Sequence, residues 1–354
     1  MPFLFFLIGS LCWFSTLEAS SLGQISFLGF SRLQTDTRIC ASLNTPLATA
    51  PFGGISGVEY DATQNHYWLL SDDPGYRAPP RFYKMKIHLD QRGIHQVHCS
   101  DVRPLQKRAG HAFGLGQVDG EEIRLYNNRL LWSSEAQNRL LGLDPAVRMM
   151  DFHGVQTVRL QLPEHYQSQA GRVVDNGSFE GLTLLGKEHA LLAVEHPLKG
   201  DGTNIRLLKL DLQTHDSVAT YAYPQSFYQD KELSVVSLLA VNDTQVLVLE
   251  RLWPYKDGNI LIRLVLYDLT EAQDVHDMAY LQGKHLQYGK KQLLANITEW
   301  PEVRRAVGYL DNQEGMTWGP TLVDGRRTLL LVSDNNFNSK QSTLFLAFAL
   351  ALKN

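Results

Sequence analysis

Short apolar runs of about five residues recur along this sequence, and most of them end in an acidic or amide residue. In each copy of the pattern, a polar residue begins one apolar run, turn residues such as Asn127-Asn128 or Asp324-Gly325 follow, and an acid ends the second run. Two such runs in succession predict a β-hairpin. The five copies span residues 56–73, 121–135, 180–195, 234–250 and 314–334.

The intervals between the hairpins contain further strand-like runs, such as residues 206–210 and 260–267, and therefore indicate four strands per unit. Radial repetition of four-stranded antiparallel sheets is a β-propeller. The long interval before the last hairpin leaves room for one more unit, so we expect an all-β protein with six blades. Residues 22–30 and 342–350 are expected to complete one blade from both termini, which makes residues 22–354 a single domain.

A two-domain β-sandwich or a mixed α/β protein is the main alternative to the propeller. A parallel α/β sheet needs helices between its strands, and helical signals are sparse in this chain. We expect one short helix, within residues 270–280. The periodicity therefore favours the propeller.

The first 21 residues have the pattern of an export signal, with an apolar stretch at residues 1–17 and small residues at positions 19–21. The stretch contains no Lys or Arg, so an uncleaved anchor is the alternative. We expect a secreted or periplasmic protein with no membrane span after cleavage of the signal peptide. Cys40 and Cys99 remain after cleavage, and in an oxidising compartment they form either a disulfide or two buried thiols.

The 354 residues carry a formal net charge of −4, with a pI near 6.3. The chain therefore lacks the excess of basic residues that is typical of proteins that bind nucleic acid or an anionic membrane surface. We therefore expect a monomer whose partner is a small molecule.

Acidic residues dominate the candidate chemistry, because antiparallel pairing brings the two polar ends of each hairpin to the same edge. Radially arranged hairpins would then gather many carboxylates at one mouth of the central channel. Such a group requires raised pKa values, basic partners or hard cations, and Ca²⁺ takes six to eight oxygen ligands. We expect calcium, with strand-end caps and pairs to arginine as the alternative. The candidate metal ligands are Asp72, Glu121, Glu135, Glu180, Glu195, Glu250, Glu314 and Asp334.

Basic and amide residues adjoin these acids and are candidates for binding an ester or phosphoester: Arg206, Arg251, His196 and Asn335. Glu180, Glu314 and Arg251 are the candidate catalytic residues. The sequence contains no Gly-X-Ser-X-Gly elbow, no phosphate-binding loop and no His-Glu-X-X-His motif. Serine-triad, nucleotide and zinc-protease chemistry therefore lack support.

Several motifs occur in an order that resembles a known family. They are Gly54-Ile55-Ser56-Gly57 with Ser71-Asp72-Asp73, Leu131-Trp132-Ser133-Ser134-Glu135, Asn176-Gly177-Ser178-Phe179-Glu180-Gly181-Leu182, and Glu314-Gly315-Met316-Thr317-Trp318-Gly319-Pro320 with Ser333-Asp334-Asn335-Asn336-Phe337. Over residues 50–350 the chain is similar to the secreted bacterial proteins with a phytase-like domain, described as "esterase-like activity of phytase". The resemblance implies an exported β-propeller-like protein with phosphatase or esterase activity. Glu121-Glu122 departs from the family pattern, which has Glu-Gly there.

Three functions agree with these observations. The first is a secreted, calcium-dependent hydrolase of phosphate or carboxylate esters. The second is a non-catalytic propeller that binds a partner and is stabilised by calcium. The third is a lactonase-like hydrolase of cyclic esters. A propeller fold is compatible with each of them, so the site has to decide.

Overall fold

The computed structural model describes residues 22–352, apart from residues 36, 136–143, 175–176 and 256–258. The expected signal peptide, residues 1–21, lies outside the described residues. No helix in the described part of the chain is both long and apolar enough to cross a membrane.

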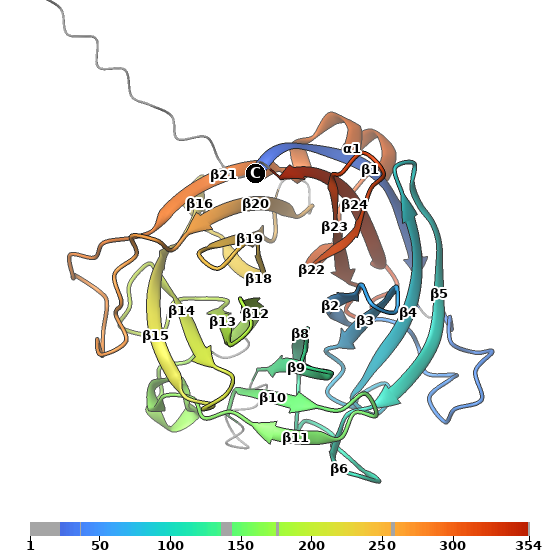
Figure 1. Ribbon diagram of the computed structural model, residues 1–354, viewed down its shortest axis with the longest axis horizontal. Coiled ribbons are helices and arrows are strands. Elements are labelled where there is room, and N and C mark those ends of the chain that lie inside the picture. Colours follow the sequence, from blue (N-terminus) through green and yellow to red (C-terminus); the bar gives the residue numbers. More distant parts are fainter. Residues whose placement is uncertain (1–21, 36, 136–143, 175–176, 256–258, 353–354) are drawn as a thin grey trace, which may run out of the picture.

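Five four-stranded antiparallel sheets surround a central axis as the blades of a propeller (Figure 1). The first blade consists of β2 (Ile55–Asp61), β3 (His66–Ser71), β4 (Arg81–Asp90) and β5 (Gly93–Pro104). The second consists of β8 (Gly120–Tyr126), β9 (Arg129–Ser134), β10 (Ala146–Met150) and β11 (Gln156–Arg159). The third consists of β12 (Phe179–Leu185), β13 (His189–Val194), β14 (Asn204–Asp211) and β15 (Ser217–Pro224). The fourth consists of β18 (Ser234–Ala240), β19 (Gln245–Leu252), β20 (Leu261–Asp268) and β21 (Lys290–Asn296). The fifth consists of β22 (Asn312–Thr321), β23 (Arg327–Asp334), β24 (Ser342–Leu352) and β1 (Leu22–Gln34).

Short elements occupy the connections between these strands. Two small hairpins are formed by β6 (Gln106–Arg108) with β7 (His111–Ala112) and by β16 (Phe227–Tyr228) with β17 (Lys231–Glu232). The helical elements are the 3-10 turns η2 (Glu164–Tyr166), η3 (Ser168–Ala170) and η5 (Ile297–Glu299) and the α-helix α1 (Pro301–Val307).

The propeller and its four-stranded antiparallel sheets are confirmed, but the expectation of six blades is wrong. The long interval before the last hairpin forms an excursion, residues 269–289, followed by β21, η5 and α1. The excursion covers the outer strand of the third blade, where the Val275 N–H donates a 2.7 Å hydrogen bond to the Thr220 carbonyl. The excursion therefore accounts for the extra residues of this interval without forming a sixth blade. The helix expected within residues 270–280 is also absent.

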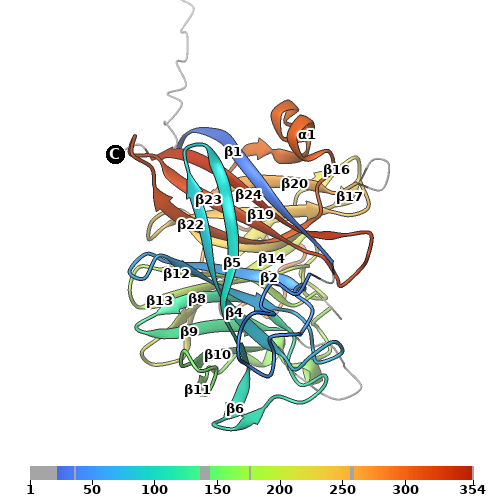
Figure 2. The same cartoon turned by 90° about the vertical axis from the view of Figure 1, so that its right-hand side faces the viewer.

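The two ends of the described chain meet in the fifth blade, as expected. Strand β1 pairs antiparallel with β24 along its length, with Phe27 opposite Phe348, and becomes the outermost strand of that sheet. It also lies beside β5 of the first blade (Figure 2). There a Cβ added to Gly29 would lie 3.2 Å from Cα of Gly93. The N-terminal strand therefore connects the fifth blade to the first.

The apolar runs are uninterrupted because each blade packs against a neighbour on both faces. Alternate side chains of a strand point to opposite faces of its sheet. In β23, Leu329 and Leu331 pack in a cluster with residues of the fourth blade, whereas Leu330 and Val332 pack with residues of the first. All four side chains are fully buried. An apolar run in this chain is thus the sequence signature of a strand buried on both faces.

Close approach of the inner strands requires small residues near the axis. A Cβ added to Gly57 would lie 2.9 Å from the backbone of Glu121, and one added to Gly315 would lie 2.9 Å from the Ser56 carbonyl oxygen. The second blade has Glu122 at the equivalent position, which is the departure noted in the sequence. The Glu122 carboxylate fills the axis and accepts hydrogen bonds from the Val58 N–H, the Ser237 hydroxyl and Arg124.

Arg124 completes this axial network. Its guanidinium donates hydrogen bonds to the carbonyl oxygens of Val58, Leu238 and Met316, which belong to the first, fourth and fifth blades. Burial raises the pKa of Glu122 to about 8, although Arg124 partly offsets this rise. The pair thus joins four blades and separates the two mouths of the channel.

Cys40 and Cys99 form a disulfide with a Cα–Cα distance of 5.1 Å. Of the two alternatives left open by the sequence, the structure has the disulfide. It attaches the segment that precedes the first blade to β5, the outermost strand of that blade.

Candidate functional site

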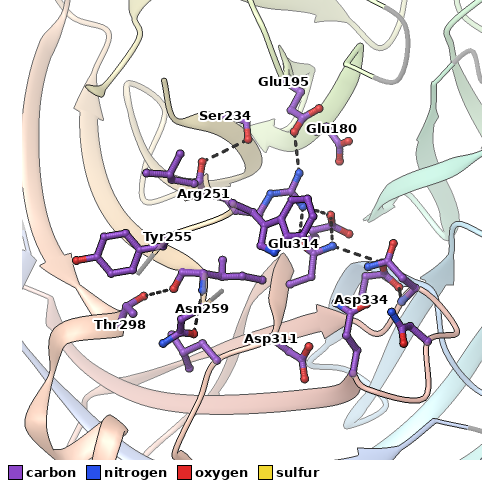
Figure 3. A pocket seen from close by; sticks show the side chains of 18 of the residues that line it. Glu180, Glu195, Ser234, Arg251, Tyr255, Asn259, Thr298, Asp311, Glu314 and Asp334 are labelled. Carbon is purple, nitrogen blue, oxygen red and sulfur yellow. Dashed lines mark hydrogen bonds and ion pairs between the residues drawn. The ribbon is translucent and has the colours of Figure 1, made fainter. Parts of the chain in front are cut away.

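A cavity of about 1180 Å³ opens at the mouth of the channel where the inner strands begin. Carboxylates from four blades line it, together with Arg251, His196 and several aromatic residues. Figure 3 shows Arg251 between Glu195 and Glu314 at the wall of this cavity. The acids at the ends of the blade strands are Asp72, Asp119, Glu121, Glu135, Glu180, Glu195, Glu314 and Asp334, and the connections add Glu232, Glu299 and Asp311. The gathering of acids at one mouth, which the hairpin pattern predicts, is therefore present.

Two features of the hairpins bring these acids together. Antiparallel pairing places Asn312 opposite Asp334, and the Glu135 N–H donates a 3.0 Å hydrogen bond to the Asp119 carbonyl. In addition, the inner strand of every blade contains a register shift near its start, and Glu180 and Glu314 occupy two of these shifts. A β-bulge redirects a side chain from the sheet face. The bulges thus direct these two glutamates into the cavity.

The second blade supplies a compact triad of acids, Asp119, Glu121 and Glu135. One carboxylate oxygen from each lies within 4.8 Å of those of the other two, and each residue is at most 5% exposed. Within the described chain, Oδ1 of Asp119 has no hydrogen-bond partner although it is buried. Burial, followed by the charges of neighbouring acids, raises the pKa of Asp119 and of Glu121 well above the usual range. The triad could therefore hold a metal ion.

Asp72 and Glu180 extend this charge across the cavity. Their carboxylates have no hydrogen-bond donor among the residues that the structure describes. Burial and then the charge of Asp119 raise the pKa of Asp72, while burial and then Glu195 raise that of Glu180. In the absence of a cation, such a cluster must bind protons to relieve its mutual repulsion.

Arg251 is the main positive charge among these acids. Its Nη2 donates a 2.7 Å hydrogen bond to Glu195, and its Nη1 donates to Glu314 (Figure 3). Burial alone would lower the pKa of Arg251, but Glu314 and Glu195 raise it above its usual range. Arg251 is therefore charged and links the third, fourth and fifth blades at the cavity wall.

Comparison with protein families finds one match over most of the chain. A model of the phytase-like family, described as "esterase-like activity of phytase", matches residues 50–337. The chain belongs to the phytase-like family. None of the curated proteins compared matches this sequence.

Solved structures with a similar fold share little sequence with this phytase-like chain. An endo-arabinase from Bacteroides thetaiotaomicron VPI-5482 is 12% identical, with 89% of this chain and 96% of that chain covered and a TM-score of 0.47. An α-L-arabinofuranosidase from Lactobacillus brevis is 11% identical, with 83% and 90% covered and a TM-score of 0.44. A periplasmic gluconolactonase from Pseudomonas aeruginosa is 12% identical, with 92% and 100% covered and a TM-score of 0.39.

Two of the residues expected at the mouth of the phytase-like channel lie elsewhere. Glu250 accepts 2.6 Å hydrogen bonds from the Tyr223 and Ser226 hydroxyls and pairs with Lys291 at 2.9 Å. It precedes Arg251 in β19, so alternation along the strand directs the two side chains to opposite faces. Arg206 is buried against Asp201, at 2.7 Å, and also lies outside the cavity.

His196 and Asn335, the other candidates for substrate binding, have different positions. His196 lines the cavity, with Nε2 at 3.5 Å from Glu195 and about a third of its side chain exposed. Asn335 is buried, and its Oδ1 accepts hydrogen bonds from the backbone N–H groups of Gly54 and Phe337. Asn335 thus supports a loop, whereas its neighbour Asn336 lines the cavity.

Asp119 is the member of the acidic triad that sequence reasoning missed. A signal for it was present, because extension of the second hairpin by one pair beyond Gly120 and Ser134 places Asp119 beside Glu135. The pattern of acids at hairpin ends begins at Glu121 in this blade, so it does not include Asp119.

Proposed function

We propose that this phytase-like protein is an exported, calcium-dependent hydrolase of phosphate or carboxylate esters. The observation that carries the proposal is the buried triad of Asp119, Glu121 and Glu135, in which an Asp119 oxygen has no partner among the described residues. A buried polar atom without a partner costs free energy unless a ligand satisfies it. A cation is the ligand that best suits three converging carboxylates.

The donor set supports calcium over a transition metal. All three members of the triad are carboxylates, and hard oxygen ligands favour Ca²⁺, whereas Zn²⁺ sites in proteins usually include His or Cys. Asp72, Glu180 and Asp334 line the same cavity and offer further oxygens. Asp119, Glu121 and Glu135 would hold the ion. When bound, the cation would polarise a phosphoryl or carbonyl oxygen of the ester.

The residues of the chain itself would bind and orient the substrate. Arg251 carries a positive charge at the cavity wall and can orient an anionic ester oxygen with its planar guanidinium. Glu180 has a carboxylate with a raised pKa and no hydrogen-bond donor in the described chain, which suits the acceptance of a proton from an attacking water. Glu314 would hold Arg251 in place through their hydrogen bond.

The disulfide supports the proposed export, because disulfides persist in oxidising compartments and are rare in the cytosol. An export signal at residues 1–21 would deliver the protein to the periplasm or the extracellular medium. A periplasmic fraction and the culture medium, probed for a protein cleaved after residue 21, would test this part of the proposal.

The enzymatic proposal is tested with protein that begins at residue 22. Phytate, p-nitrophenyl phosphate, p-nitrophenyl acetate and a γ-lactone are assayed with calcium and with a chelator. We expect hydrolysis of at least one ester that is lost on chelation, in Asp119→Asn and in Glu180→Gln, but retained in Glu164→Gln, which alters an exposed acid. Hydrolysis that survives chelation and Asp119→Asn would contradict the proposal.

A calcium-stabilised binding module is the second candidate. It is favoured because the acids of the cavity come from several blades. One cation near the triad would therefore also hold neighbouring blades together. In that case chelation lowers the melting temperature, and none of the esters is hydrolysed.

A further inference from the structure

A second cavity lies at the opposite mouth of the channel. It has a volume of about 650 Å³ and is lined by residues near the ends of the inner strands, including Tyr60, Leu184, Ala240 and Thr321. The acidic cavity lies at the other end, where the same strands begin. The axial pair Glu122 and Arg124 stands between the two. The second mouth therefore has its own lining, which the proposed ester chemistry does not use.

Arg327 provides a positive charge at this mouth without a counterion. Its guanidinium lies over the Trp318 ring, 4.2 Å from the centroid, and the side chain is partly buried. No carboxylate pairs with it in the described part of the chain. Burial lowers the pKa of Arg327, which is the direction expected for a cation that has lost water and gained no acid.

Arg124 provides a second guanidinium to the lining. It is 2% exposed, and its Nε–H has no acceptor among the described residues, although both Nη groups donate to carbonyl oxygens. Arg124 is thus a buried cation that lines the cavity and has one hydrogen-bond donor without a partner among the described residues.

Glu59 is the one acid among the described residues that line this cavity. Its carboxylate lies 3.8 Å from Nη1 of Arg124 and accepts a hydrogen bond from the Leu125 N–H. Burial raises the pKa of Glu59, and Arg124 offsets part of that rise. Arg124 thus has acids on both sides, Glu59 in the lining and Glu122 on the axis, whereas Arg327 is the lining cation without a counterion in the described chain.

We propose that the second mouth binds a small organic carboxylate, with its charged group at Arg327 and Arg124 and an apolar or aromatic body beside Trp318 and Tyr60. A guanidinium binds a carboxylate through paired, charge-assisted hydrogen bonds. Ligand cavities typically combine such a polar anchor with aromatic walls. The proposal is independent of the ester hydrolase, because the two sites share no lining residue.

The test is calorimetric titration of the full chain with benzoate, in the presence of a chelator. We expect saturable binding that benzyl alcohol, the neutral analogue, does not reproduce. Arg327→Gln should weaken benzoate binding by about tenfold or more, as loss of the charged anchor predicts. Arg326→Gln is the matched control, because Arg326 pairs with Asp324 and does not line the cavity. It should leave the affinity unchanged.

Glu59→Gln should change the affinity for benzoate in the opposite direction. The substitution removes the acid that competes for Arg124, so benzoate should bind more tightly than in the unmodified protein. Absence of benzoate binding, equal affinity in Arg327→Gln, or loss of binding in Glu180→Gln at the acidic mouth would each overturn the proposal. Thermal melting of every variant establishes that the fold is retained.

Discussion

Arg251 donates a 2.7 Å hydrogen bond from Nη2 to Oε1 of Glu195, a contact that joins the fourth blade to the end of a strand of the third. Its other Nη group donates to Glu314 of the fifth blade. A single side chain thus neutralises acids from two neighbouring blades in a cavity that otherwise has an excess of negative charge. This arrangement leads to the first prediction.

Arg251→Gln should destabilise the metal-free protein by about 3 kcal/mol, because removal of one partner leaves buried acids unpaired. The same change makes the cavity more negative, so calcium should raise the melting temperature of the variant by more than that of the unmodified protein. Differential scanning fluorimetry with calcium and with a chelator measures both effects. Arg326→Gln serves as the control and should behave like the unmodified protein. An equal rise in melting temperature with calcium in Arg251→Gln and in the unmodified protein would contradict the prediction.

Glu122→Ala should lower the free energy of unfolding by about 3–5 kcal/mol, because it leaves Arg124 buried on the axis without its acid. Glu122→Gln should cost clearly less, since the amide oxygen can still accept from Arg124 and from the backbone N–H of Val58. Urea unfolding of the two variants makes the comparison. Equal losses would contradict this prediction, because they would show that the charge of Glu122, and neither its volume nor the hydrogen bonds an amide can keep, determines stability at this position.

His66 should make the protein less stable in mild acid. Burial, followed by the charge of Lys84, lowers its pKa from 6.5 to about 4, and neither ring nitrogen has a hydrogen-bond partner in the described chain. A folded-state pKa below the unfolded one means that stability is complete above pH 6.5 and is lost as the pH falls toward 4.

The measurement is the free energy of unfolding across this pH range for the unmodified protein and for His66→Gln. The variant should show a shallower fall toward acid pH, even if its stability at pH 8 is lower. His98→Gln, which changes an exposed histidine, should retain the original slope. Parallel curves for the unmodified protein and His66→Gln would show that His66 is not the cause of the loss of stability in mild acid.

The Cys40–Cys99 disulfide should contribute about 2–4 kcal/mol to stability, because it closes a long loop and restricts the unfolded chain. The two cysteines are 59 residues apart in the sequence. Unfolding in guanidinium with a reductant should match unfolding of the Cys40→Ala/Cys99→Ala variant without one. If the reductant also destabilises the Cys40→Ala/Cys99→Ala variant, the loss of stability on reduction does not come from this disulfide.

The hairpins and the acids at their ends could be predicted from the sequence, because strands buried on both faces leave apolar runs and the turns between them are short. Blade number could not be predicted by the same reasoning. The spacing of hairpins does not distinguish a sixth blade from an excursion such as residues 269–289. Pro301, at the start of α1, was the local signal that part of this interval is helical.

The composition of the site was predictable only in part, because it depends on register. Whether Glu250 or Arg251 faces the cavity depends on which face of β19 each occupies, and a shift of one residue exchanges them. A glycine follows each of the bulges at Glu180 and Glu314 and is a common mark of a bulge, but it does not show by itself which way the preceding side chain points. Asp119 required the correct extension of one hairpin. Pairing geometry, more than residue type, decided which acids belong to the site.

The pairing of β1 with β24 has a consequence for biosynthesis. Residues 22–34 are synthesised long before their partner, residues 342–352. Contacts between such distant segments form slowly, and an unpaired strand edge promotes aggregation in the meantime. A chain that ends early would leave the apolar strands of the fifth blade without a partner. Closure of the ring therefore requires both segments, and truncation before residue 342 should leave an exposed strand edge on the fifth blade.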